Sequence, residues 1–201
     1  MISTLRYLCL TFSVFTVAAM AQDEGWEVAL EEDGLIVQTR SVEGSDFKAF
    51  WANTVIDATP EDVFARLQDV KSYPGWFPDT LKAERLEAED GSLANYVVTD
   101  IPWPLKDRDA VYAVSNDVSP ELIVTTVTAD PDRVPENSKY VRIREASGEW
   151  RLTALNEGGT RIDWTFHLEP GGNIPAGLAN ARVIETPQKA LLALKEYFES
   201  R

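Results

Sequence analysis

The sequence is poor in the side chains on which metal sites and nucleophilic enzymes depend. Its 201 residues include one cysteine, Cys9, and one histidine, His167. A metal site needs clustered Cys, His, Asp or Glu, and a Ser-His pair would have to use His167, which strand alternation places on a polar face. The sequence contains no Gly-x-Ser-x-Gly elbow and no glycine-rich phosphate loop. We therefore expect no metal, no cofactor and no catalytic residue.

Basic side chains are also scarce. Lys and Arg number 19 against 33 Asp and Glu, which gives a net charge of −14. Nucleic-acid binding relies on Lys and Arg contacts to phosphates, and an anionic membrane surface repels a protein of the same sign. The charge argues against a nucleic-acid partner and predicts membrane contacts that are transient at most.

Long hydrophobic runs are missing except near the N-terminus. Residues Leu8 to Val17 form an apolar run that follows Arg6 and is too short to span a bilayer. It leads into Ala19-Met20-Ala21, a small-x-small pattern that signal peptidase accepts. The pattern predicts a signal peptide over residues 1–21, removed so that the mature chain begins at Gln22 in the periplasm or outside the cell. An uncleaved anchor is the alternative.

The predicted mature chain, residues 22–201, has the length of one domain. Removal of residues 1–21 takes away Arg6 and the single cysteine, which leaves 18 basic and 33 acidic residues and a net charge of −15. Disulfides and thiol chemistry are thereby excluded. No internal repeat and no Gly/Ser/Pro-rich linker divides this stretch, so we expect one domain and a monomer.

The first part of the domain mixes strands and helices. Trp26 to Glu32 is interpreted as a short helix, followed by strands that begin at Leu35 and cover Phe47 to Ile56. Thr59-Pro60-Glu61-Asp62 predicts a capped helix start. Tyr73 to Pro78, rich in Pro and Gly, is expected to end that helix.

A series of segments with period-two alternation follows. The last segment shows the pattern best, because Ile162, Trp164 and Phe166 alternate with polar residues. Short polar or glycine-containing connections between strands are typical of an antiparallel meander with one apolar face. The expected strands are residues 81–87, 93–101, 109–116, 122–129, 139–144, 149–155 and 160–169.

The stretch Gly171 to Arg201 is predicted to form a long amphipathic helix that is entered through a turn at Gly171-Gly172-Asn173. Pro175 suits its first turn, and Pro187 should kink it or split it in two. Beyond that point Leu191 and Leu194 fall on one face with Phe198. The sheet is the natural cover for this face, so the order of elements predicts an α+β fold. We expect the gap between sheet and helix to be the working part of the molecule.

The chain resembles a START domain, the lipid-transfer branch of the helix-grip superfamily. The most specific match is the block Pro102-Trp103-Pro104 followed by Asp107-Arg108-Asp109. The resemblance implies a curved antiparallel sheet wrapped around a long kinked C-terminal helix, with a hydrophobic tunnel that binds or shuttles one lipid-like molecule without catalysis. The matching stretches span nearly the whole mature chain in order: residues 33–40, 57–64, 73–78, 102–109 and 174–187.

Several aromatic and apolar residues are candidates for the wall or gate of that tunnel. Large rings in strands usually belong to the core. Trp76 and Phe77, in a Pro/Gly-rich loop, either fold back into the core or form an exposed gate; Trp103, between two prolines, raises the same question. The candidates are Trp76, Phe77, Tyr96, Trp103, Tyr112, Trp164, Phe166 and Leu178.

The cluster Asp107, Arg108 and Asp109 has two interpretations. The favoured one is a structural salt bridge that holds the turn before a strand, because buried ion pairs are costly unless fully satisfied. The other is a partly buried polar site on the tunnel wall that pairs with a polar group of the lipid.

Two functions follow for such a chain. The first is a non-enzymatic carrier of a lipid or another hydrophobic molecule. The second is a cyclase- or hydratase-like enzyme of the same superfamily, which would use carboxylate or tyrosine acid/base chemistry on a hydrophobic substrate. The shortage of acid/base groups on apolar faces favours the carrier, while Tyr96 and Tyr112 keep the enzyme as the alternative.

Overall fold

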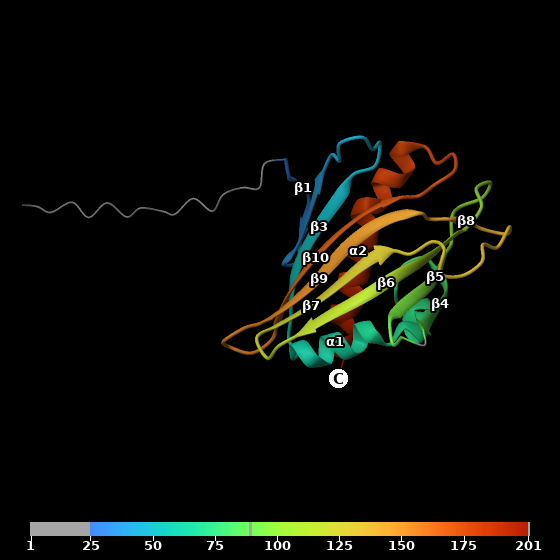
Figure 1. Cartoon of the computed structure of the whole chain (residues 1–201). Coiled ribbons are helices and arrows are strands. Elements are labelled where there is room, and N and C mark those ends of the chain that lie inside the picture. The colour runs from blue at the N-terminus through green and yellow to red at the C-terminus, as the bar shows by residue number, and fades with distance from the viewer. Residues whose placement is uncertain (1–24, 89, 201) are drawn as a thin grey trace, which may run out of the picture.

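A curved antiparallel sheet holds a long C-terminal helix against one of its faces, as the computed structural model in Figure 1 shows. The structure describes residues 25–88 and 90–200. The predicted signal peptide lies outside the described residues and stays a prediction. Among the described helices, none is both long and apolar enough to cross a membrane.

The sheet contains ten strands, and nine of them follow the order β1-β2-β3-β10-β9-β7-β6-β5-β4. All neighbours along this path are antiparallel, whereas the short β8 pairs in parallel with β6. Because β10 lies between β3 and β9, segments from both ends of the domain meet in its middle. The bounds are β1 Glu27–Glu32, β2 Leu35–Arg40, β3 Ala49–Ile56, β4 Thr80–Glu87, β5 Leu93–Thr99, β6 Arg108–Val118, β7 Leu122–Ala129, β8 Val141–Arg142, β9 Glu145–Ala154 and β10 Thr160–Glu169.

The first strand corrects the sequence interpretation, which placed a short helix at Trp26 to Glu32. Asp33 and Gly34 have positive φ angles of 49° and 75° and form a two-residue turn. Two such residues suit the type I′ hairpin turn, whose twist matches that of paired strands. The turn brings Glu32 opposite Leu35, so β1 pairs with β2, whereas a helix this short is marginal without strong packing.

The first helix begins where the sequence predicted it. In α1 (Pro60–Gln68) the Thr59 side chain accepts a 3.2 Å hydrogen bond from the backbone N–H of Asp62, with Pro60 in the first turn. A 3-10 helix, η1 (Val70–Gly75), then carries the chain into β4. Val63 and Leu67 of α1 are buried, and the helix packs at one end of the sheet against β7 and β9 (Figure 1).

The C-terminal helix, α2 (Ala176–Glu199), is continuous. Pro187 lies inside this helix and is buried. The helix therefore is not split in two at this proline. The helix starts one residue after Pro175, whose carbonyl accepts hydrogen bonds from the backbone of the first turn. Leu191 and Leu194 are fully buried, which confirms the predicted apolar face.

The main core joins the C-terminal half of α2 to α1 and to the inner face of β2, β3, β9 and β10. On β10 the predicted alternation is present, since Ile162 and Trp164 are both buried. All the buried residues of α2 fall between Pro187 and Leu194. The N-terminal half of the helix contributes only the partly buried Val183 to this core, and the space beneath it becomes the candidate site.

Candidate ligand-binding cavity

A cavity of about 240 Å³ lies between the inner face of the sheet, the N-terminal half of α2 and the segment that follows η1. Most of its wall is aliphatic or aromatic. Ligand pockets in proteins usually measure about 300–1,000 Å³, so this volume suits a small or single-chain molecule. The location agrees with the predicted gap between helix and sheet.

Stacked and edge-on rings build the deep wall of the cavity. Trp150 of β9 and Trp164 of β10 stack with ring centroids 4.0 Å apart. Phe50 of β3 meets Trp164 edge-on at 4.8 Å, and Phe77 meets it at 5.8 Å. Four segments distant in sequence thus supply one aromatic surface, which the pairing of β10 with both β3 and β9 brings together.

Phe166 lies in the cavity wall because β9 leaves room for its ring. Its strand partner is Gly148, and a Cβ added to that glycine would lie 2.2 Å from the ring of Phe166. A glycine inside a strand often marks such a close approach. This role of Gly148 could not be read from the sequence, because it depends on the register between β9 and β10.

The structure brings together only part of the predicted site. Among the tunnel candidates, five contribute to the cavity wall: Phe77, Tyr112, Trp164, Phe166 and Leu178. Trp76, Tyr96 and Trp103 do not. Several residues that do line the cavity were not predicted from the sequence, including Phe50, Trp150, Val127 and Ile143.

Trp76 folds back toward the protein. Its indole N–H donates a 3.1 Å hydrogen bond to the Ser72 hydroxyl, and the Arg66 guanidinium lies 4.8 Å from its ring. The ring also meets Tyr73 and Phe77 edge-on. Of the two interpretations of this loop, the structure shows the inward-packed one, because each ring finds an aromatic or polar neighbour on η1 or α1.

Trp103 occupies the opposite environment. It lies in the connection between β5 and β6 with 91% of its surface exposed, so of its two interpretations the inward-packed one is wrong. Pro102 and Pro104 have no backbone N–H with which to extend a strand ladder, which explains why β5 stops at Thr99.

Tyr96 points away from the cavity. Its strand neighbours Asn95 and Val97 line the cavity, and successive side chains of a strand face opposite sides. The Tyr96 hydroxyl donates a 3.2 Å hydrogen bond to Asp109 Oδ2. Burial, reinforced by the Asp109 carboxylate, raises its pKa to about 12.

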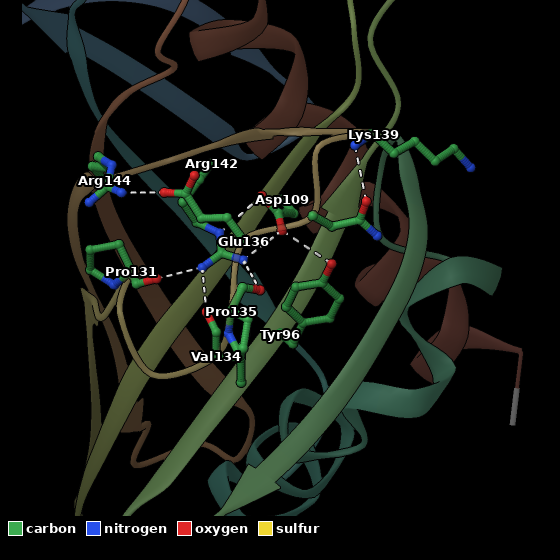
Figure 2. A network of polar contacts seen from close by, with 10 residues as sticks. Tyr96, Asp109, Pro131, Val134, Pro135, Glu136, Lys139, Arg142 and Arg144 are labelled. Atoms are coloured by element: carbon green, nitrogen blue, oxygen red, sulfur yellow. Dashed lines mark hydrogen bonds and ion pairs between the residues drawn. The ribbon is translucent and has the colours of Figure 1, made fainter.

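Asp109 is the centre of a structural network on this side of the sheet (Figure 2). Arg142 grips the carboxylate with two hydrogen bonds, from Nε at 3.0 Å and from Nη2 at 2.8 Å, and both side chains are buried. The same guanidinium donates to backbone carbonyls of the preceding loop, at Pro131, Val134 and Pro135. The hydrogen bond to Asp109 raises the pKa of Arg142, and the network ties that loop to β6.

Arg108 lies on the cavity wall and has no part in that network. It is 3% exposed, and its guanidinium donates to the carbonyls of Pro170 at 3.2 Å, Gly171 at 3.0 Å and Lys106. Burial lowers its pKa. The carboxylate of Asp107 accepts instead from the backbone N–H of Ile101 at 3.2 Å.

The expected salt bridge within Asp107, Arg108 and Asp109 is therefore wrong. Arg108 and Asp109 are consecutive residues of β6 and so point to opposite faces. The ion pair that does form joins Asp109 to Arg142, 33 positions away.

The cavity wall contains two side chains that could act as a general base, His167 and Asp79, and Asp79 is paired with Arg182. Burial strongly raises the pKa of the Tyr112 hydroxyl, so this group stays protonated at neutral pH. His167 Nε2 lies 3.4 Å from Glu169 Oε1. Within the described residues, no group of three or more His, Cys, Asp or Glu is placed to hold a metal ion.

A curved sheet that closes on a C-terminal helix around an apolar cavity defines a class of hydrophobic-ligand-binding folds. The chain belongs to the polyketide cyclase/dehydrase and lipid transport family, whose sequence pattern matches residues 49–199. Its fold is the helix-grip fold of START domains, as the resemblance predicted.

Two similar proteins are bacterial. An uncharacterized protein of Pseudomonas aeruginosa is 34% identical over 98% of both chains. The crystal structure of a STAR-related lipid transfer protein from Xanthomonas axonopodis is also 34% identical, covers 88% of this chain and 99% of its own, and superposes with a TM-score of 0.80. Human StAR-related lipid transfer protein 5, 16% identical, covers 90% of this chain and 89% of its own with a TM-score of 0.74, and shares the fold.

Proposed function

We propose that the protein binds one lipid or lipid-like molecule in the cavity and carries it without converting it. The observation that carries this proposal is the apolar, largely aromatic cavity between α2 and the sheet. The relative from Xanthomonas axonopodis, which matches along nearly its whole length, is described as a lipid transfer protein and supports it.

The energetics of transfer favour shielding and exchange. Moving an acyl chain from water into an apolar cavity gains about 0.8 kcal/mol per methylene. Moving it out of a bilayer gains almost nothing, because lipid tails are already out of water. A carrier of this kind protects a lipid during transit and exchanges it at either end.

An enzyme on this fold would need a proton acceptor beside its substrate. The tyrosine that faces the cavity, Tyr112, is held protonated by burial, so it can donate a hydrogen bond but is a poor base. Tyr96, the other candidate, does not line the cavity. Neither tyrosine therefore supplies a base, and the cyclase- or hydratase-like alternative would have to use His167, which lines the wall; we favour the carrier.

Native mass spectrometry tests the proposal. The protein, purified gently from the organism that makes it, should carry one small molecule that is released on denaturation. Ala179 of α2 lines the cavity, so Ala179→Phe places a ring inside it and should abolish binding of the small molecule. Ala181 is exposed, so Ala181→Phe is the matched control and should still bind it. Absence of any adduct in the parent, also after incubation with a total lipid extract, would remove the carrier function.

A further inference from the structure

The charged side chains that line the cavity have the opposite sign to the molecule as a whole. The chain has a net charge of −14, yet the charged residues of the cavity wall are Lys48, Arg108 and Arg182 against a single carboxylate, Asp79. Arg182 is paired with Asp79. The structure records no ion pair for Lys48 or Arg108 among the described residues, so the wall has two cations without a carboxylate.

Of these two cations, Arg108 is the more unusual because it is almost completely buried. The three acceptors of its guanidinium are backbone carbonyls, which take up three of its five N–H donors but carry no net charge. Burying an ion without a counter-ion costs several kcal/mol. A buried cation without an ion-pair partner is typical of a site that binds a charged ligand.

The neighbouring carboxylates make their hydrogen bonds with other groups than Arg108. Figure 2 shows Asp109 directed at Arg142 and Tyr96. Arg142 holds both oxygens of this carboxylate, and Asp107 is held by the backbone of Ile101. Arg108 therefore feels the charge of Asp107 but forms no ion pair with a carboxylate among the described residues.

The cavity places this charge beside apolar surface. Arg108, at the start of β6, shares the wall with Tyr112, four residues further along the same strand, and with Leu178 and Phe166. A molecule that fills the cavity can therefore keep its chain among the rings while a polar end meets the guanidinium.

We propose that the preferred ligand is an anionic amphiphile, and that Arg108 binds its anionic group, a carboxylate or a phosphate. This inference rests on the proposed function and narrows it from lipids in general to those with a compact anion. Guanidinium forms paired, charge-assisted hydrogen bonds with both anions.

Three probes with the same twelve-carbon chain test the preference: laurate, dodecyl phosphate and the neutral dodecanol. Binding is followed by the fluorescence of Trp150 and Trp164, which line the cavity. At least one anionic probe should bind about tenfold or more tightly than dodecanol, and the tighter of the two identifies the anion. Equal binding of all three would overturn the anion preference while leaving the carrier function intact, and no binding of any would remove both.

Variants assign the preference to Arg108. Arg108→Gln should lose most of the difference in affinity between the anionic probes and dodecanol, while its affinity for dodecanol stays within about threefold of the parent. Arg108→Lys should restore part of the preference for the anionic probes. Arg151→Gln, which removes an equal charge from an exposed position on β9, should behave as the parent. A full preference in Arg108→Gln would exclude Arg108 as the receptor.

A final experiment distinguishes a site that binds amphiphiles from a site that binds any small anion. Inorganic phosphate, which has no chain, should not displace dodecyl phosphate at millimolar concentration. Displacement there would mean that the guanidinium binds free phosphate and would overturn the proposal. This displacement experiment and the comparison of the three probes both use the parent protein. Their outcomes therefore do not depend on whether a variant folds.

Discussion

Tyr73 shows how a single side chain can link the first helix to the cavity. Its hydroxyl donates a 2.6 Å hydrogen bond to the carbonyl of Leu67 near the end of α1. Its ring stacks on Phe77 with centroids 5.1 Å apart and also lines the cavity. Burial raises the pKa of this tyrosine to about 12.

This pKa predicts a loss of stability at alkaline pH. The folded state holds the proton more tightly than the unfolded chain, whose tyrosines titrate near 10. The contribution is therefore complete below about pH 10 and disappears as the pH rises toward 12. A rise from about 10 to about 12 corresponds to roughly 2–3 kcal/mol.

Tyr73→Phe should flatten this alkaline decline and should cost about 1 kcal/mol at pH 7 through the lost hydrogen bond. Urea unfolding of parent and variant between pH 7 and 11 measures both effects. Tyr96 and Tyr112, whose pKa values are also raised, leave a residual slope in the variant. Parallel curves for the two proteins would show that Tyr73 does not ionise with unfolding.

Strand alternation was sufficient to predict part of the cavity wall. Trp164 and Phe166 follow from the period of β10 alone, and both line the cavity. Tyr96 and Arg108 were not separable in this way, because which face of β5 or β6 is inward depends on pairing across the sheet. The partner of Asp109 lies 33 positions away, beyond the reach of a local pattern.

At the scale of elements, the segment between β10 and α2 is defined by its backbone. Gly171 and Gly172 have φ angles of +64° and +61°, a region that costs other residues roughly 1–2 kcal/mol. A Cβ on Gly172 would lie 3.4 Å from Nη2 of Arg108. The two glycines therefore shape the turn that contacts the cavity cation.

Gly172→Ala should lower the free energy of unfolding by about 1–2 kcal/mol because of this left-handed backbone. Gly177→Ala is the matched control: it lies in the first turn of α2, and a Cβ there meets nothing within 4 Å. That control should leave stability unchanged or raise it by up to about 1 kcal/mol. Equal effects in urea unfolding would contradict the assigned role of the turn.

Most elements could be predicted because their signals are local. The cap at Thr59, the alternation of β10 and the apolar face of α2 all lie within short stretches. The prediction failed where tertiary contacts decide. The run at Trp26 to Glu32 becomes a strand because β2 pairs with it, and Pro187 stays within one continuous helix that Leu191 and Leu194 anchor in the core.

At the scale of the whole molecule, charge controls the encounter with membranes. The net charge of −14 repels anionic lipid surfaces, and salt screens this repulsion over about 10 Å at 0.1 M. The cavity cations are buried or partly buried within the fold and do not present a basic surface.

Uptake of a fluorescent lipid from vesicles that contain anionic lipid should therefore be severalfold faster at 0.2 M salt than at 0.02 M. Uptake from neutral vesicles should depend little on salt and serves as the control. Slower uptake at high salt would mean that a local basic surface docks the protein. Transfer experiments monitored by donor quenching measure all four rates.

The helix that covers the inner face of the sheet is synthesised after all the described strands. Every strand precedes residue 170, whereas α2 begins at Ala176. A ribosome that adds roughly 5–20 residues per second completes the apolar rings of β3, β9 and β10 before their cover exists. During biogenesis this surface is uncovered and favours chaperone contact, and a chain cut before Ala176 would present it permanently as an aggregation-prone face.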